Sequence, residues 1–158
     1  MIVIAIVAWV VGVGAGGVLL TRRGAWYDGL RKPAWQPPDW LFGPAWTAIY
    51  LAAAWAWWQA WGPAAARPGL QLGIVVAFLA NGLLNLGWSY LFFWRRRPDW
   101  ALLEVRLLLV SIVMLIAVIA PVDRAAAWLI VPYLVWVGFA SILNAALVRL
   151  NRPFAGTR

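Results

Sequence analysis

The residues that could carry chemistry in this sequence are aromatic rings and a few side-chain amides. The chain has no cysteine and no histidine, which excludes thiol nucleophiles, disulfides, thiolate metal sites and the commonest general base. It has 14 tryptophans, and each indole combines a large apolar ring with one N–H donor. These residue types favour binding of a flat apolar molecule over conventional acid-base or nucleophilic catalysis.

Several of these residues repeat at helical spacing along three segments. Residues at i, i+3, i+4 and i+7 lie on one face of a helix, so each set forms a stripe. The stripes are Trp46, Tyr50, Ala53 and Trp57 in segment 41–61, Phe78, Asn81, Asn85, Trp88 and Phe92 in segment 70–94, and Trp128, Pro132, Trp136, Ala140 and Leu143 in segment 125–148. Pro132 removes a backbone donor, so we expect a bend there that opens a pocket.

The polar and charged residues within these apolar segments each have two interpretations. Asn81 and Asn85 should point into a bundle, where they either join helices through hydrogen bonds or contact a ligand. Glu104 lies about one turn inside segment 100–120, and the adjacent Arg95, Arg96 and Arg97 favour a structural ion pair over a catalytic acid. Six tryptophans near segment ends are explained by interfacial anchoring: Trp55, Trp58, Trp61, Trp94, Trp100 and Trp128.

The composition requires lipid as the solvent of the elements that position these residues. Hydrophobic residues make up 65% of the chain and charged residues only 11%, a balance that a soluble domain of this size could not cover with a polar surface. Five apolar stretches, each near the roughly 20 residues that cross a bilayer core, lie at about 2–20, 41–61, 70–94, 100–120 and 125–148. The predicted fold is all-α: a polytopic membrane protein in which a single domain, 1–158, forms a five-transmembrane-helix bundle.

The basic residues predict the orientation of this bundle. With five spans, one side receives two, Arg67 and Arg124, and the other receives ten: Arg22, Arg23, Arg31, Lys32, Arg95, Arg96, Arg97, Arg149, Arg152 and Arg158. The positive-inside rule then places the N-terminus outside and the C-terminus in the cytoplasm. Because these charges sit in short loops beside apolar runs, the net charge of +8 does not indicate a nucleic-acid partner. The long, proline-containing loop 21–40 is expected to fold over the cytoplasmic mouth as a lid, and the alternative is that its aromatic residues only anchor it at the membrane interface.

Several long motifs resemble one family. They are WYDGLRKPAWQPPDW from Trp26 to Trp40, GPAW from Gly43 to Trp46, LNLGWSYLFF from Leu84 to Phe93 and VPYLVWVGFA from Val131 to Ala140, followed by LN at Leu143. In this order they resemble the translocator proteins, also called tryptophan-rich sensory proteins. The resemblance covers nearly the whole chain.

This resemblance implies a five-helix, usually dimeric bundle that binds porphyrins such as protoporphyrin IX, and sterols in some members. Members are linked to tetrapyrrole transport, stress signalling and light-dependent porphyrin breakdown, and the tryptophans implicated in the breakdown correspond to Trp46 and Trp136. The other pocket positions of the family correspond to Tyr27, Pro37, Tyr50, Asn85, Trp88, Ala140 and Leu143. The sterol-recognition pattern is broken, because Ala145 stands where the family's aromatic residue lies.

The leading hypothesis is therefore a porphyrin receptor or carrier in a bacterial cell membrane, which requires no cofactor. The macrocycle would stack among Trp46, Trp88 and Trp136, with its propionates near Arg31 and Lys32. Because the chain has no histidine, a metal-free porphyrin fits better than haem. The alternatives are a light-dependent porphyrin-degrading enzyme that uses Trp46 and Trp136, and a sterol-binding or lipid-binding regulatory scaffold.

Overall fold

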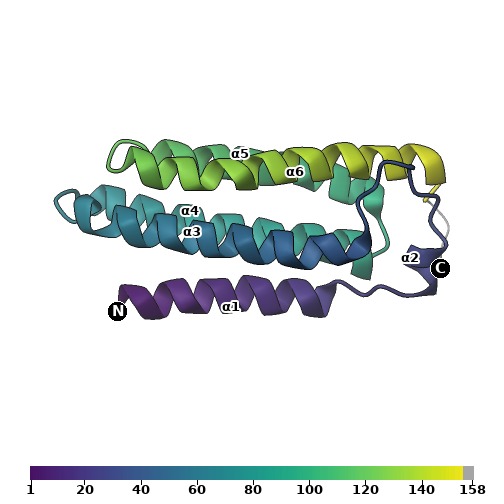
Figure 1. Ribbon diagram of the computed structural model, residues 1–158, viewed down its shortest axis with the longest axis horizontal. Coiled ribbons are helices and arrows are strands. Elements are labelled where there is room, and N and C mark those ends of the chain that lie inside the picture. Colours follow the sequence, from purple (N-terminus) through teal and green to yellow (C-terminus); the bar gives the residue numbers. More distant parts are fainter. Residues whose placement is uncertain (155–158) are drawn as a thin grey trace.

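The computed structural model describes residues 1–154, and these form a bundle of long helices without any strand (Figure 1). The five long predicted helices are present, and their ends agree with the predicted spans within about three residues. A short helix also lies in the first loop, and a π-helical turn continues the third long helix. In chain order the elements are α1 (Ile2–Leu20), α2 (Ala25–Asp28), η1 (Asp39–Leu41), α3 (Phe42–Ala64), α4 (Pro68–Ser89), η2 (Tyr90–Trp94), α5 (Pro98–Ile119) and α6 (Arg124–Asn151).

Local sequence explains where the last three long helices begin. Pro68 and Pro98 occupy the first turns of α4 and α5, where a missing backbone N–H costs nothing and the fixed φ angle suits a helix. Asp123 caps α6, because its carboxylate accepts a hydrogen bond of 2.9 Å from the backbone N–H of Ala126. These signals confine the turns between helices to a few residues.

Four helical segments within residues 1–154 are long and apolar enough to cross a membrane: Ile2–Leu20, Pro68–Trp94, Pro98–Ile119 and Arg124–Asn151. The remaining long helix, α3, has 23 residues and packs against α1 and α6, but it contains no stretch of 18 residues with the hydropathy found in the other four. Five tryptophans and Gln59 cause this difference. Indole is counted as weakly polar on hydropathy scales although its ring is readily buried.

The two ends of the bundle differ in charge. The N-terminus, the α3–α4 turn and the α5–α6 turn lie at one end, and segment 21–40, the α4–α5 turn and the end of α6 lie at the other (Figure 1). The first end carries Arg67 and Arg124, and the second carries nine of the ten basic residues that the sequence places together. The tenth, Arg158, lies outside the described residues.

Close packing of α1 on α4 depends on one glycine. The indole N–H of Trp9 donates a hydrogen bond of 2.7 Å to the backbone carbonyl of Phe78, one turn before Gly82. A Cβ atom at Gly82 would lie 2.7 Å from Trp9 Nε1 and 2.9 Å from a methyl carbon of Val13. Trp57 of α3 stacks on the Phe78 ring, with 4.3 Å between ring centroids, and also contacts the Trp9 ring edge-on. Gly82 therefore allows three helices to meet around three aromatic rings.

We predict that Gly82→Ala destabilises the bundle by about 1 to 3 kcal/mol, because the added methyl group overlaps Trp9 and Val13. Gly12→Ala is the matched control on the facing helix, since nothing lies within 4 Å of a Cβ atom there. The measurement is the free energy of unfolding in mixed detergent micelles. Equal stability of the two variants would show that α1 and α4 do not pack as described.

Candidate ligand-binding site

A cavity of about 550 Å³ opens between the helices at the end of the bundle that segment 21–40 crosses. Its wall contains eight of the residues that the sequence places in a pocket: Tyr27, Trp46, Tyr50, Asn85, Trp88, Trp136, Ala140 and Leu143. Residues from α1, α2, α3, α4, η2, α5 and α6 all contribute to it. The cavity is therefore a product of the whole bundle rather than of one motif.

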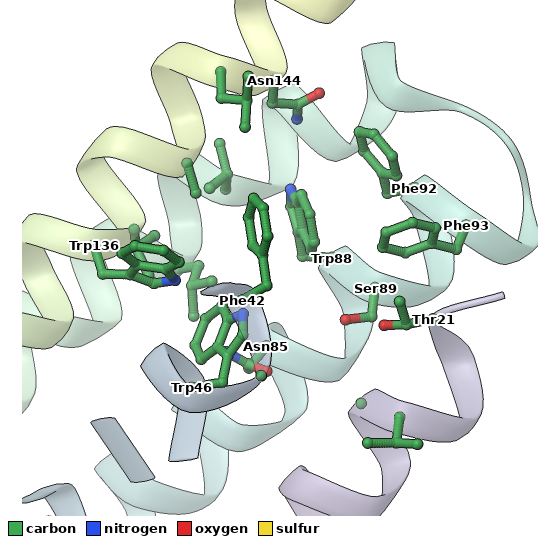
Figure 2. Close-up of a pocket in the computed structure, with 18 of the residues that line it drawn as sticks. Thr21, Phe42, Trp46, Asn85, Trp88, Ser89, Phe92, Phe93, Trp136 and Asn144 are labelled. Atoms are coloured by element: carbon green, nitrogen blue, oxygen red, sulfur yellow. The ribbon is translucent and has the colours of Figure 1, made fainter. Parts of the chain in front are cut away.

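Aromatic rings form opposing walls of this cavity (Figure 2). Trp46 stacks on Tyr50 with 5.4 Å between ring centroids, and Trp88 stacks on Phe92 with 5.1 Å. Phe42 packs edge-on against Trp136 at 5.6 Å. Rings held in place by neighbouring rings present flat, rigid apolar surfaces, which suit a flat ligand at low entropic cost.

Two indole groups in the wall have unused hydrogen-bonding capacity. The Nε1 atoms of Trp88 and Trp136 are both buried, and neither has a hydrogen-bond partner within residues 1–154. Both residues line the cavity. An unsatisfied buried N–H group costs about 1 to 3 kcal/mol. Neither nitrogen atom is accessible from the cavity, so a ligand could accept a hydrogen bond from it only after the indole ring turned.

A chain of hydrogen bonds lies beneath the aromatic walls and links four helices. The Tyr50 hydroxyl donates to Asn85 Oδ1 at 2.9 Å, and Asn85 Nδ2 donates to the Tyr133 hydroxyl at 3.1 Å. Tyr133 in turn donates to Asn81 Oδ1 at 3.2 Å, and Asn81 Nδ2 donates to Ser111 Oγ at 2.9 Å. Of the two interpretations of the amides, Asn81 therefore joins helices, whereas Asn85 joins helices and also faces the cavity.

A second polar cluster closes the mouth of the cavity. Asp39 accepts hydrogen bonds of 3.3 Å from the Tyr27 hydroxyl and from Gln36 Nε2, and its carboxylate lies 3.9 Å from the Arg23 guanidinium. Burial, together with the negative charge of Asp39, raises the pKa of Tyr27, so its hydroxyl remains a donor. Arg23 and Tyr27 both line the cavity, so this cluster fastens segment 21–40 to its rim.

Three residues expected at the ligand lie elsewhere in segment 21–40. Arg31, Lys32 and Pro37 are not part of the cavity wall. The backbone of Arg31 makes two hydrogen bonds to the Asn151 side chain, at 2.8 and 2.9 Å, which ties the segment to the end of α6. Lys32 Nζ lies 3.9 Å above the Tyr27 ring. The cation in the wall is Arg23, which the sequence interpretation did not single out.

The expected ion pair of Glu104 with Arg95, Arg96 or Arg97 is wrong. Arg97 instead forms a bidentate pair with Asp99, with bonds of 2.8 and 2.6 Å, because Asp99 is only two residues away across the start of α5. Both carboxylate oxygens of Glu104 are buried without a partner in residues 1–154. Glu104 does not line the cavity.

The expected pocket face of α6 is wrong in its first half. Trp128 is 72% exposed and Pro132 is also exposed. The next residue, Tyr133, is the one that lies on the buried face of α6. Positions four apart on a helix drift by about 40° per step, so a row of i+4 positions winds away from the core. Pro132 does not line the cavity. Tyr133 was missed although it lies inside the VPYLVWVGFA motif.

The tryptophans assigned to interfacial anchoring lie outside the cavity wall. Trp55, Trp58, Trp94, Trp100 and Trp128 are exposed, and Trp61 is half-buried. Exposed indoles near helix ends are typical of membrane interfaces. Many wall residues belong to no periodic stripe and were not predicted, among them Arg23, Phe42, Phe93 and Asn144.

Comparison with known proteins confirms the family resemblance. The sequence model of the TspO/MBR family matches residues 3–150. A tryptophan-rich protein TspO of Chlorobaculum tepidum is 38% identical over 138 residues, which cover 87% of each chain. The translocator protein of Homo sapiens is 37% identical over 138 residues, 84% of this chain and 79% of that protein. A tryptophan-rich sensory protein of Cereibacter sphaeroides is 35% identical over 142 residues, 86% of this chain and 84% of its own.

We predict that Tyr133→Phe lowers the free energy of unfolding by about 1 to 2 kcal/mol, because Asn81 and Asn85 each lose a partner in an apolar interior. Tyr90→Phe is the matched control, since Tyr90 is exposed and its hydroxyl makes no hydrogen bond within residues 1–154. Unfolding in mixed micelles measures both variants. If Tyr133→Phe were as stable as the control, the hydrogen-bond chain would carry no stability.

Proposed function

The chain belongs to the TspO/MBR family of membrane proteins, and we propose that it binds a porphyrin-like tetrapyrrole in the aromatic cavity. The observation that carries this proposal is a cavity walled by aromatic rings that pack on one another and include Trp46, Trp88 and Trp136. The cavity volume of about 550 Å³ falls within the roughly 300 to 1,000 Å³ typical of ligand pockets. Burial of the macrocycle would stabilise the complex by roughly 25 cal/mol per Å² of apolar surface.

Charge at the mouth supports an amphipathic ligand with acidic groups. Arg23 is the cation in the wall, so the propionates of a porphyrin would accept charge-assisted hydrogen bonds from its guanidinium. Arg23 donates two hydrogen bonds of 3.4 Å to the backbone carbonyl of Asp39, and its guanidinium lies 3.9 Å from the Asp39 carboxylate. A guanidinium has five N–H donors, so three remain for an acidic group of the ligand. This assignment replaces Arg31 and Lys32 as the residues nearest the acidic groups.

The role that follows from binding is that of a receptor or carrier that acts in tetrapyrrole transport or stress regulation. A second candidate is light-dependent breakdown of the bound porphyrin. The position of Trp46 favours this second function, because the centroid of its ring lies 5.4 Å from that of Tyr50 and 5.9 Å from that of Tyr133. One of these rings can donate an electron to the photoexcited ligand, which oxidises the ring and reduces the ligand, and this step requires neither cysteine nor histidine.

We also propose that α3 crosses the membrane, which gives five spans with the N-terminus outside and the C-terminus in the cytoplasm. The length of α3 and its position between α1 and α6 support this topology. The excess of basic residues at one end supports the orientation. In a bacterium this membrane would be the cell membrane.

We predict that cysteines introduced at Arg96 and Arg152 are labelled only from the cytoplasm, and that cysteines at Arg67 and Arg124 are labelled only from outside. The chain has no cysteine of its own, so each variant reports a single site. The measurement is modification by a membrane-impermeant maleimide in intact cells and in inverted vesicles. Labelling of the cysteines at positions 67 and 96 from the same side of the membrane would contradict the assignment of α4 as a span.

We predict that Trp46→Phe and Trp136→Phe each alter porphyrin chemistry more than Trp58→Phe, because Trp58 is exposed on the outside of α3. For a protein that only binds the porphyrin, each cavity substitution should weaken the binding of protoporphyrin IX by about 1 kcal/mol, which is the contribution of an aromatic pair. For a light-dependent enzyme, affinity should persist while loss of the porphyrin absorption band under illumination stops.

Both outcomes come from fluorescence titration in the dark, followed by absorption spectra of the same samples in light. Stable quenching of the fluorescence without loss of the porphyrin absorption band supports a function as a receptor or carrier. A new absorbing product in light supports a function as a porphyrin-degrading enzyme. Identical behaviour of all three tryptophan variants in both assays would rule out the cavity as the porphyrin site.

A further inference from the structure

A second hollow, of about 540 Å³, lies beside the ligand cavity at the basic end of the bundle. It is formed where the chain leaves α1, enters α2 and passes through η2. Its lining residues are Arg22, Arg23, Gly24, Ala25, Trp26, Phe93, Trp94 and Arg96. Only Arg23 and Phe93 are shared with the ligand cavity, so the two hollows are distinct.

The charge of this hollow is strongly positive. Three of its lining residues carry guanidinium groups, and none carries a carboxylate. The ion pairs within residues 1–154 join Arg23 to Asp39 and Arg97 to Asp99, so Arg22 and Arg96 have no acidic partner there. Guanidinium groups close together without counter-charge attract an anion that can accept several hydrogen bonds.

The geometry of the chain holds two of these arginines in place. The Arg22 guanidinium lies 3.8 Å from the centroid of the Trp94 ring, a cation–π contact that fixes its position. Arg96 has a φ angle of 52°, in the left-handed region that residues with a side chain rarely adopt. It follows the π-helical turn η2, where the Arg95 N–H reaches back to the Tyr90 carbonyl at 2.9 Å. Such turns inside helices occur frequently at functional sites.

The depth of the hollow in the membrane indicates where its anion comes from. It lies beside the ends of two apolar segments, Ile2–Leu20 and Pro68–Trp94, which is the level of the lipid headgroups. Trp94 is 46% exposed and Trp26 is half-buried, as expected for indoles at an interface. A free phosphate ion would gain nothing from this aromatic border, whereas a lipid would cover it with its glycerol and upper acyl chain.

We propose that this hollow binds the phosphate group of an anionic phospholipid, with Arg22 and Arg96 as its principal ligands and Trp94 against the glycerol region. The proposal is independent of what occupies the aromatic cavity. Arg23 contributes charge to both sites, but its contacts with Asp39 direct it toward the mouth of the cavity.

The test compares lipid binding by the whole protein and by two double variants. The first variant, Arg22→Gln with Arg96→Gln, removes the two unpaired charges of the hollow. The control, Arg95→Gln with Arg149→Gln, removes two exposed charges from the same end of the protein that do not line the hollow. Native mass spectrometry from detergent micelles counts bound phosphatidylglycerol and bound phosphatidylcholine on each protein, and separate samples contain inorganic phosphate as competitor.

We expect the wild type and the control to bind phosphatidylglycerol at least about tenfold more tightly than phosphatidylcholine, and the Arg22 and Arg96 variant to lose this preference. Protoporphyrin IX affinity and thermal stability verify that each variant is folded. Absence of any preference in the wild type, or equal loss in the control, would overturn the proposal. Displacement of phosphatidylglycerol by millimolar inorganic phosphate would overturn the lipid assignment and indicate a free-anion site.

Discussion

Polar side chains inside an apolar bundle must satisfy one another, and the Tyr133 hydroxyl is where that requirement is met. It accepts a hydrogen bond from Asn85 and donates one to Asn81. Asn85 in turn accepts a hydrogen bond from Tyr50, and Asn81 donates one to Ser111. This single chain of hydrogen bonds fixes the relative positions of α3, α4, α5 and α6. In lipid, no water is available to replace a lost partner, so the arrangement of these four helices is tightly restricted.

The aromatic cavity depends on this restriction. Tyr50 and Asn85 belong both to the hydrogen-bond chain and to the cavity wall. Stacking of Trp46 on Tyr50 then sets the position of one wall, and stacking of Trp88 on Phe92 sets another. Trp88 and Trp136 line the same space from α4 and α6. A rigid apolar space of this kind is better suited to binding a ligand than to close packing.

Much of this arrangement could be predicted from the sequence, because apolar length and helical spacing are local properties. The five long helices, the inward direction of Asn81 and Asn85, and most of the aromatic wall follow from them. The errors concern features that depend on how side chains meet in the folded bundle. Arg97 pairs with Asp99 and leaves Glu104 without a partner in residues 1–154, and Tyr133 replaces Pro132 on the inner face of α6 because an i+4 row drifts around the helix. Arg23 could not be identified because only the folded segment 21–40 brings it to the mouth.

A structure of the protein with protoporphyrin IX would show directly whether one porphyrin binds between the tryptophans of α3, α4 and α6. We expect one macrocycle per chain, in contact with Trp46, Trp88 and Trp136, and a propionate at Arg23. A macrocycle bound on the lipid-facing surface, with the cavity tryptophans unchanged, would contradict this expectation.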